Sequence, residues 1–380
     1  MSFLAIGLAG CSLFGLNEVG PNVAARHVVW QMRWAEGQLS SMAPFEYGEY
    51  VFFSDRNDQT FRSSIFWADK RTGELRGQWD ETIAAALDYG QMHRYKNLLV
   101  FVSDRMEKIT AFNLDTRRTE WKIPALSTSS HLRGLNDKLL VATQGHFEII
   151  DLDEPFGLRQ PVTVAEQLNE VFAPFVLPEW YRNSQNETML LLLSFPQKTP
   201  TALTYRVPSR TITKTLPLYS TPVGGKGAER LAWYGDHLFY QDIDRLDCRD
   251  TLGNLVWTFP FKGVDSKGSP FFIEEGKVFV KGRSVDALYA LDPTSGKVLW
   301  KLPDETINTG SGQRFFYQNG VIYIAQGELY AVDARTGAVL WGQEGRWIQS
   351  KYYGQVGGNV SSKRIYTATG GALVCLDAVR

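Results

Sequence analysis

Cysteine and histidine are scarce in this chain, which has three cysteines and five histidines among 380 residues. There is no Cys-x-x-Cys motif, no adjacent cysteine pair and no haem-attachment motif, and no two histidines stand at the spacing of metal ligands. The chain therefore shows no motif for a zinc site, a covalently bound haem or a dithiol redox centre. We expect no catalytic residue, no cofactor-binding residue and no metal ligand.

The chain also lacks an excess of either charge, because 40 Lys and Arg residues nearly balance 41 Asp and Glu residues. Nucleic-acid binding needs a concentrated basic surface, so we do not expect that function. A run of about 18 apolar residues is missing too, and a membrane-spanning helix is not predicted. Apolar residues nevertheless make up 44% of the chain and aromatic residues 13%, enough for a large packed core.

The most informative feature that is present is a repeated unit near the C-terminus. Residues 288–300 read LYALDPTSGKVLW, and residues 329–341 read LYAVDARTGAVLW. The unit predicts a buried strand, a tight turn opened by Asp and a second strand ending on a large ring. Gly in the turn can adopt a positive φ without a Cβ clash. We expect each Trp ring to pack between neighbouring repeats.

Weaker copies of the unit run through most of the chain, with a degenerate copy at residues 202–207. Counting that copy gives eight units at an average spacing of about 44 residues, which is the length of a four-stranded propeller blade. The residues predicted to build the turns and to dock neighbouring blades are Asp69, Asp115, Asp250, Trp257, Asp292, Gly296, Trp300, Asp333, Thr336, Gly337, Trp341 and Asp377.

The last copy ends at Asp377 without its final strand, and the N-terminal segment can supply that strand. Residues 27–31, HVVWQ, are similar to residues 297–301, KVLWK. Borrowing an N-terminal strand would hide the edges that an incomplete blade exposes. The sequence thus predicts an all-β fold: one eight-bladed β-propeller domain of four-stranded blades over residues 27–380, closed by the N-terminal strand.

Two of the cysteines belong to this repeat. Cys248 and Cys375 each stand two residues before a turn Asp, where the best copies have Ala290 and Ala331. We expect small buried thiols in place of Ala. A disulfide between them is not expected, because they belong to blades that are not adjacent.

The pattern Ala331-x-Asp333-x-x-Thr336-Gly337-x-x-x-Trp341 resembles the tryptophan-docking motif of PQQ-type quinoprotein propellers. The resemblance covers nearly the whole chain and is weakest between about residues 152 and 235. It implies a fold and says little of function. Quinoprotein dehydrogenases of this kind usually carry an adjacent cysteine pair near the cofactor, and that pair is absent here, so the resemblance predicts no bound cofactor.

The N-terminus resembles a bacterial lipoprotein signal. Residues 1–11 are apolar and end in Leu8-Ala9-Gly10-Cys11, followed by Ser12, although no Lys or Arg precedes Cys11. This resemblance implies lipidation of Cys11, a flexible tether over residues 12–26 and a lipid-anchored protein on the periplasmic side of the outer membrane. The alternative is an apolar N-terminal segment in which Cys11 occurs by chance.

The segment at about residues 154–187 departs from the repeat and is predicted to be an irregular insertion. Within it, Trp180, Tyr181 and Arg182 are residue types favoured at protein–protein contacts. We expect these three residues to contact a partner protein, and the alternative is a loop packed over blade 3 or 4.

Three functional hypotheses remain open. The first is a non-catalytic scaffold that binds proteins of the bacterial envelope, similar to the lipoproteins of outer-membrane protein assembly, acting as a monomer within a complex. The second is a partner-specific binding or immunity lipoprotein of another envelope system. The third is a quinoprotein-type oxidoreductase.

Overall fold

The computed structural model describes residues 28–33, 42–57, 62–84, 92–103, 108–124, 131–143, 146–154, 162–163, 179–194, 201–207, 211–218, 230–241, 245–260, 271–280, 287–303, 314–325, 329–343, 355–359, 361–369 and 372–379. All regular secondary structure in these ranges is β-strand. The strands form eight antiparallel four-stranded sheets, each a meander of strands in sequence order except for one strand in the last sheet. Such sheets are the blades of a β-propeller, and the predicted eight-bladed fold is confirmed.

The chain divides into two compact units, and the first contains residues 1–88 and 300–380. It holds blades 1, 7 and 8. Their strands are β2 (Phe45–Tyr47), β3 (Tyr50–Asn57), β4 (Arg62–Asp69) and β5 (Leu75–Ala84) in blade 1, β26 (Arg314–Gln318), β27 (Val321–Ala325), β28 (Leu329–Asp333) and β29 (Val339–Gln343) in blade 7, and β30 (Gln355–Asn359), β31 (Arg364–Thr369), β32 (Ala372–Asp377) and β1 (Val28–Arg33) in blade 8.

The second unit contains residues 89–299 and holds blades 2 to 6, apart from the end of β25. Its strands are β6 (Met92–Tyr95), β7 (Leu98–Ser103), β8 (Lys108–Asn113) and β9 (Arg118–Pro124) in blade 2, β10 (His131–Leu135), β11 (Lys138–Thr143), β12 (His146–Asp151) and β13 (Val162–Thr163) in blade 3, β14 (Glu179–Arg182), β15 (Thr188–Ser194), β16 (Thr201–Arg206) and β17 (Thr211–Pro217) in blade 4, β18 (Arg230–Tyr234), β19 (His237–Gln241), β20 (Arg245–Arg249) and β21 (Leu255–Pro260) in blade 5, and β22 (Phe271–Glu274), β23 (Lys277–Val280), β24 (Ala287–Leu291) and β25 (Val298–Pro303) in blade 6.

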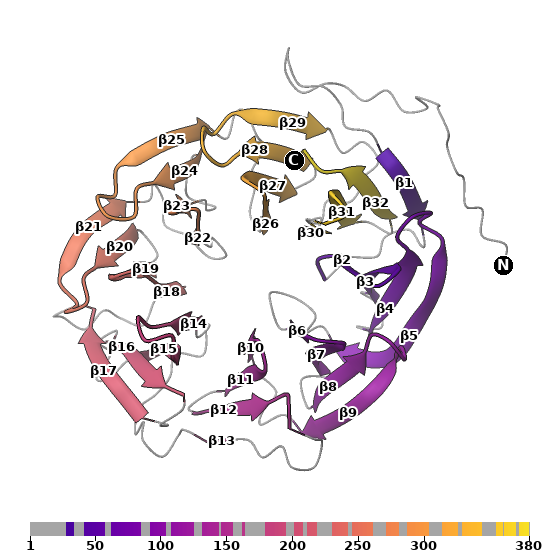
Figure 1. The fold of residues 1–380 in the computed structure, drawn as a ribbon, viewed down its shortest axis with the longest axis horizontal. Helices are drawn as coiled ribbons and strands as arrows, with labels where there is room; N and C mark the ends of the chain where they lie inside the picture. The colour runs from indigo at the N-terminus through magenta and orange to yellow at the C-terminus, as the bar shows by residue number, and fades with distance from the viewer. Residues whose placement is uncertain are drawn as a thin grey trace. The chain divides into compact units, whose positions relative to one another are not determined.

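The N-terminal strand β1 completes blade 8, as predicted. It pairs antiparallel with β32, with Trp30 opposite Cys375 and Arg33 opposite Ala372, and Figure 1 shows the two strands side by side. The degenerate copy at residues 202–207 is also confirmed, because it forms β16 of blade 4. The predicted lipoprotein signal at residues 1–11, including Cys11, and the predicted tether at residues 12–26 lie outside the described residues.

The turn Asp residues organise the connection between the third and fourth strands of a blade. Asp333 Oδ1 accepts hydrogen bonds from the backbone N–H of Arg335 and Thr336 and from the Thr336 hydroxyl, at 2.8 to 3.0 Å. Asp292 binds Thr294 and Ser295 in the same way. These bonds satisfy backbone donors that the tight turn would otherwise leave unpaired, which explains why the repeat requires Asp.

The Trp residues then dock one blade onto the turn of the next. The indole N–H donates to the carbonyl of the residue after the turn Asp in three cases: Trp30 to Lys70 at 2.9 Å, Trp257 to Pro293 at 3.0 Å and Trp300 to Ala334 at 3.1 Å. The rings lie so close to Gly73, Gly296 and Gly337 that an added Cβ would be 2.4 to 2.7 Å from indole carbons. These glycines also have positive φ, so the turn and the ring both require Gly.

A β-bulge recurs one residue before the docking position. In six outer strands the residue before the docking position has no partner in the register, namely Val29, Arg76, Glu120, Thr213, Val256 and Leu340. A bulge of this kind turns the next side chain toward a new direction. It therefore aims the docking residue away from its own sheet and at the neighbouring blade.

One predicted turn residue is wrong. In blade 2 the turn is organised by Asn113, whose Oδ1 accepts from the backbone N–H of Asp115 and Thr116 at 2.9 and 3.1 Å. Asn113 has the same spacing to Trp121 as Asp333 has to Trp341, whereas Asp115 accepts from the Asn97 amide. Asn can form the same side-chain turn as Asp, so a pattern that allows only Asp predicts Asp115 in place of Asn113.

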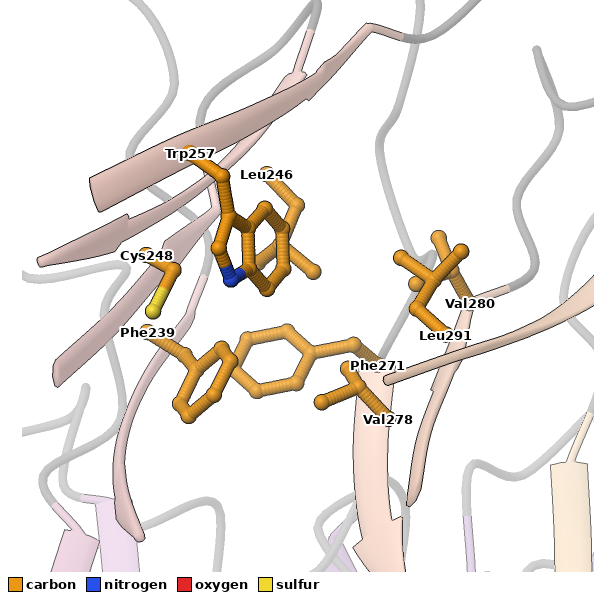
Figure 2. Packing of buried hydrophobic residues seen from close by; sticks show 8 residues of the cluster. All are labelled: Phe239, Leu246, Cys248, Trp257, Phe271, Val278, Val280 and Leu291. Carbon is orange, nitrogen blue, oxygen red and sulfur yellow. The ribbon is translucent and has the colours of Figure 1, made fainter. Parts of the chain in front are cut away.

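The core lies between blades, where the faces that two neighbouring sheets turn toward each other pack together. Between blades 5 and 6 it consists of Phe239, Leu246, Cys248 and Trp257 packed against Phe271, Val278, Val280 and Leu291 (Figure 2). The Phe239 ring lies 5.8 Å from the Trp257 ring and 6.2 Å from the Phe271 ring, centroid to centroid. Offset and edge-on contacts of this kind add to the stabilisation from burial alone.

Candidate interaction surface

In the part of the chain that the structure describes, no group of three or more His, Cys, Asp and Glu side chains is arranged to hold a metal ion. Nor does any helix there have the length and apolar character needed to cross a membrane.

The thiols of Cys248 and Cys375 are buried, as predicted for residues that replace Ala. Cys248 Sγ lies 3.7 Å from the Pro293 carbonyl oxygen, beside the docked Trp257. Burial is the largest influence on both thiols and raises their pKa values to about 12. Because the thiolate is the reactive form, both side chains are suited to packing and not to nucleophilic chemistry.

This burial predicts resistance to thiol reagents. In a Cys11→Ala protein at pH 8, Cys248 and Cys375 are expected to stay unlabelled by a disulfide reagent while the protein is folded, and to react fully in denaturant. Absorbance of the released thiolate measures the reaction. Rapid labelling of the folded protein would contradict the described burial.

The predicted contact residues Trp180, Tyr181 and Arg182 lie in a regular strand, the innermost strand β14 of blade 4. Trp180 packs against the cluster that contains Leu140 and Leu190. The described parts of the predicted insertion at residues 154–187 thus include strands β13 and β14, and its remainder lies outside the described residues.

Tyr181 and Arg182 differ in their exposure. The Tyr181 ring stacks on Trp233 of blade 5 with centroids 5.8 Å apart, and burial raises the pKa of its phenol. Arg182 is exposed and donates from its guanidinium to the Asn186 carbonyl at 3.0 Å. The two aromatic residues therefore have a packing role at the contacts of blade 4, and their part in binding a partner stays a prediction.

Blade 5 carries a buried charge cluster that the sequence reasoning missed. Arg245, Asp247 and Arg249 alternate along β20, and Asp247 is only 1% exposed. The Asp247 carboxylate accepts from the Thr258 hydroxyl and forms ion pairs with Arg245 at 3.3 Å and Arg249 at 3.4 Å. At the corresponding positions of β24 in blade 6 the chain has Ala287, Tyr289 and Leu291.

The contact between blades 4 and 5 lacks a docked Trp. The strand β17 offers Leu216, which lies 3.5 Å from the Cβ position of Gly253 in the blade 5 turn. Leu216 packs with Leu231, Leu238 and Tyr240 of blade 5. Leu238 and Tyr240 pair in register with Arg249 and Asp247, so the charge cluster lies on the face of blade 5 that meets blade 4.

Removal of the Asp247 charge is expected to destabilise this contact. Asp247→Asn keeps the shape of the side chain but leaves the largely buried Arg249 without its anionic partner. We expect a loss of about 2 kcal/mol, below the range for a fully buried pair because Arg245 is partly exposed. Equilibrium denaturation in urea measures it, and Asp115→Asn at an exposed site is the control. An equal cost for the two variants would contradict a role for the cluster.

The sequence of blade 5 itself carries a signal for this cluster. Arginine and aspartate at alternate positions of Arg245-Leu246-Asp247-Cys248-Arg249 place three charges on one face of a strand that the repeat predicts to be buried. An alignment of the repeats by their turn Asp would have shown the difference from blades 6 and 7.

The chain was compared with known proteins. Residues 241–379 match the family described as "Outer membrane protein assembly factor BamB". No protein of curated function matches the sequence. Among solved structures, BamB from Moraxella catarrhalis has a TM-score of 0.57 at 12% identity, covering 93% of this chain and 100% of its own.

Other solved structures have somewhat higher TM-scores to this chain. Quinohemoprotein alcohol dehydrogenase from Comamonas testosteroni has a TM-score of 0.63 at 10% identity, covering 92% of this chain and 76% of its own. Sqt1 from Saccharomyces cerevisiae has a TM-score of 0.65 at 9% identity, covering 94% and 100%. Identities this low establish the fold alone. Together with the family match over residues 241–379, the shared fold confirms the resemblance of this chain to the PQQ-like eight-bladed β-propellers, and to BamB among them.

Proposed function

We propose that this protein is a non-catalytic scaffold of the bacterial envelope that binds other proteins and serves outer-membrane protein assembly, as BamB does by its description. The observation that carries the proposal is the match of residues 241–379 to the BamB family. Loops and strand edges of a propeller can bind other proteins, while the fold by itself does not specify an activity.

The proposal places the protein on the periplasmic side of the outer membrane, held by a lipid on Cys11. Its support is the sequence Leu8-Ala9-Gly10-Cys11-Ser12, which resembles a lipoprotein signal. A single chain then works within a larger complex, tethered through residues 12–26. Neither a cofactor nor a nucleic acid is part of the proposed function.

The quinohemoprotein alcohol dehydrogenase likeness favours a second candidate, an oxidoreductase. Against it stands the lack of an adjacent cysteine pair, which the quinoprotein resemblance implies near the cofactor, since Cys11, Cys248 and Cys375 are far apart in the sequence. The partner-specific lipoprotein is the remaining alternative and differs from a scaffold in having a single private partner.

Affinity purification from the native envelope tests these functions. Mass spectrometry of the purified chain and of its companions is expected to identify barrel-assembly proteins together with an acylated Cys11. A single secreted protein would favour the partner-specific alternative, and a quinone cofactor with alcohol-oxidising activity would favour the enzyme. The Cys11→Ala protein is the control, and it is expected to leave the membrane fraction.

A further inference from the structure

Blade 5 exposes an apolar patch formed by Leu252, Leu255 and Val256. These residues are 75%, 54% and 45% exposed, respectively. Leu252 lies in the turn between β20 and β21, and the other two begin β21, the outer strand of the blade. Within the described part of the chain, Val298 and Leu299 at the start of β25 in blade 6 are also exposed.

At the turn position of Leu252, blades 1, 2, 3, 6 and 7 have polar residues. Two residues after the residue that organises the turn, the chain has Leu252 in blade 5, whereas the exposed equivalents elsewhere are Arg71, Asp115, Asp153, Thr294 and Arg335. The repeat thus tolerates charge at this position, and blade 5 departs from it by presenting a large apolar side chain to solvent. Exposed apolar clusters of this kind mark interaction sites.

The bulge position of Val256 gives a second, independent comparison. Polar bulge residues in other blades have partners: Arg76 pairs with Glu74 at 3.0 Å, Glu120 accepts from Asn113 at 2.9 Å, and Thr213 hydrogen-bonds Thr204 at 2.9 Å. The apolar ones, Val29 and Leu340, pack against core clusters. Val256 is an apolar bulge residue that is 45% exposed, and Leu299, the residue before Trp300 in blade 6, is 49% exposed.

The turn that presents Leu252 is held from both sides. Asp250 Oδ1 accepts from the backbone N–H of Leu252 at 2.8 Å and of Asn254 at 2.9 Å. From beneath, the Arg249 guanidinium donates to the Gly253 carbonyl at 2.9 Å and is itself paired with buried Asp247. A side chain on so constrained a turn loses little conformational entropy when it binds, which suits an interface anchor.

The charges and the strand geometry of this region decide between possible occupants. Residues 250–260 contain no Lys or Arg, whereas protein segments that insert into anionic lipid surfaces are rich in them. The bulge at Val256 and the absence of an N–H at Pro260 interrupt the outer edge of β21, which disfavours addition of a partner strand. An uncharged apolar groove on a folded protein matches both features.

We propose that the blade 5 patch docks into an uncharged apolar groove on a folded partner protein, with Leu252 as its anchor. The proposal rests on the proposed scaffold function and names the surface that the scaffold uses. The buried cluster of Asp247 and Arg249 then has a role in binding, because it supports the turn that carries the anchor.

The test replaces the patch with residues that the repeat already accepts. The double variant Leu252→Arg, Val256→Thr installs the residue types of Arg71 and Thr213, so it is expected to melt like the wild type. Asp115→Arg, the same turn position in blade 2, is the control for added positive charge. Partners captured from the native envelope by the wild type are identified and purified, and their Kd values for the three proteins are measured.

We expect the double variant to bind at least about tenfold more weakly than the wild type, and the control to bind within about twofold. Unchanged binding of an identified partner by the double variant would overturn the patch and leave the scaffold function standing. Failure of the wild type to retain any partner would overturn both. If the wild type dimerises by light scattering and the double variant does not, the occupant is a second copy of the chain, against the proposal. If the wild type binds phosphatidylglycerol vesicles and the double variant does not, the occupant is lipid, again against the proposal.

Discussion

A chain that lacks residues 27–34 is expected to aggregate and to lose cooperative melting. The deletion removes β1, the strand that pairs with β32, and leaves an edge of blade 8 uncovered. It also removes Trp30, which packs with Phe53, Phe66 and Tyr366 and donates to the Lys70 carbonyl. The loss therefore exceeds that of one buried aromatic ring, which alone costs about 3–5 kcal/mol.

Two further proteins separate the causes of this effect. Deleting residues 12–19 removes the same number of residues from the segment that precedes β1, and this deletion is expected to leave melting unchanged. Trp30→Ala keeps the strand but removes the ring, so it is expected to destabilise the protein without uncovering the edge. Size-exclusion chromatography with light scattering and thermal melting measure all three. A monomeric product with unchanged melting after deletion of residues 27–34 would show that β1 does not close the blade.

The fold could be predicted from the sequence because one set of local requirements repeats at a fixed interval. A turn that needs Asp and a positive-φ Gly, followed by a ring that contacts the next turn, specifies a blade and its neighbour together. Trp300 and Gly337 illustrate this, since the ring lies against the glycine of the following repeat. Closure by β1 followed from the same pattern, as the last repeat lacked an outer strand.

The blades whose docking contacts are made by residues outside the repeat pattern were harder to predict. In blade 1 the docking position is Gly77, and the ring of Trp67 from the adjacent strand β4 lies over it. In blade 4 the docking position is Lys214, and Leu216 contacts the next blade. In both blades another residue makes the contact in place of a Trp, and the repeat pattern in the sequence does not show which residue that is.

The exposure of the candidate contact residues could not be predicted from the sequence, because exposure depends on what the rest of the fold covers. Trp180 and Tyr181 are residue types that are common at protein–protein contacts. In β14, however, both side chains pack against core clusters. Val256 and Leu340 occupy the same bulge position with similar side chains, but one is exposed and the other packs against a core cluster. Sequence alone carries no information that separates these two cases.

Trp257→Ala is expected to cost roughly 3–5 kcal/mol of folding free energy, the range for a buried aromatic side chain truncated to Ala. The ring packs against Phe239 and Phe271 (Figure 2), and its removal leaves a cavity beside Gly296. Trp341→Ala, at the same repeat position in blade 7, is expected to cost a similar amount, because that ring is 2% exposed. The midpoint of equilibrium chemical denaturation measures both losses.

Replacement by Phe separates the ring from its hydrogen bond. Trp257 Nε1 donates to the buried Pro293 carbonyl, so Trp257→Phe removes that bond and leaves the acceptor only the weak Cys248 thiol at 3.7 Å, at a cost of about 1–3 kcal/mol beyond the lost area. Trp341 Nε1 is buried without a hydrogen-bond partner, so Trp341→Phe removes an unsatisfied donor and is expected to cost less. If Trp341→Phe is the more damaging of the two, the indole hydrogen bond does not contribute to docking, and shape alone holds neighbouring blades together.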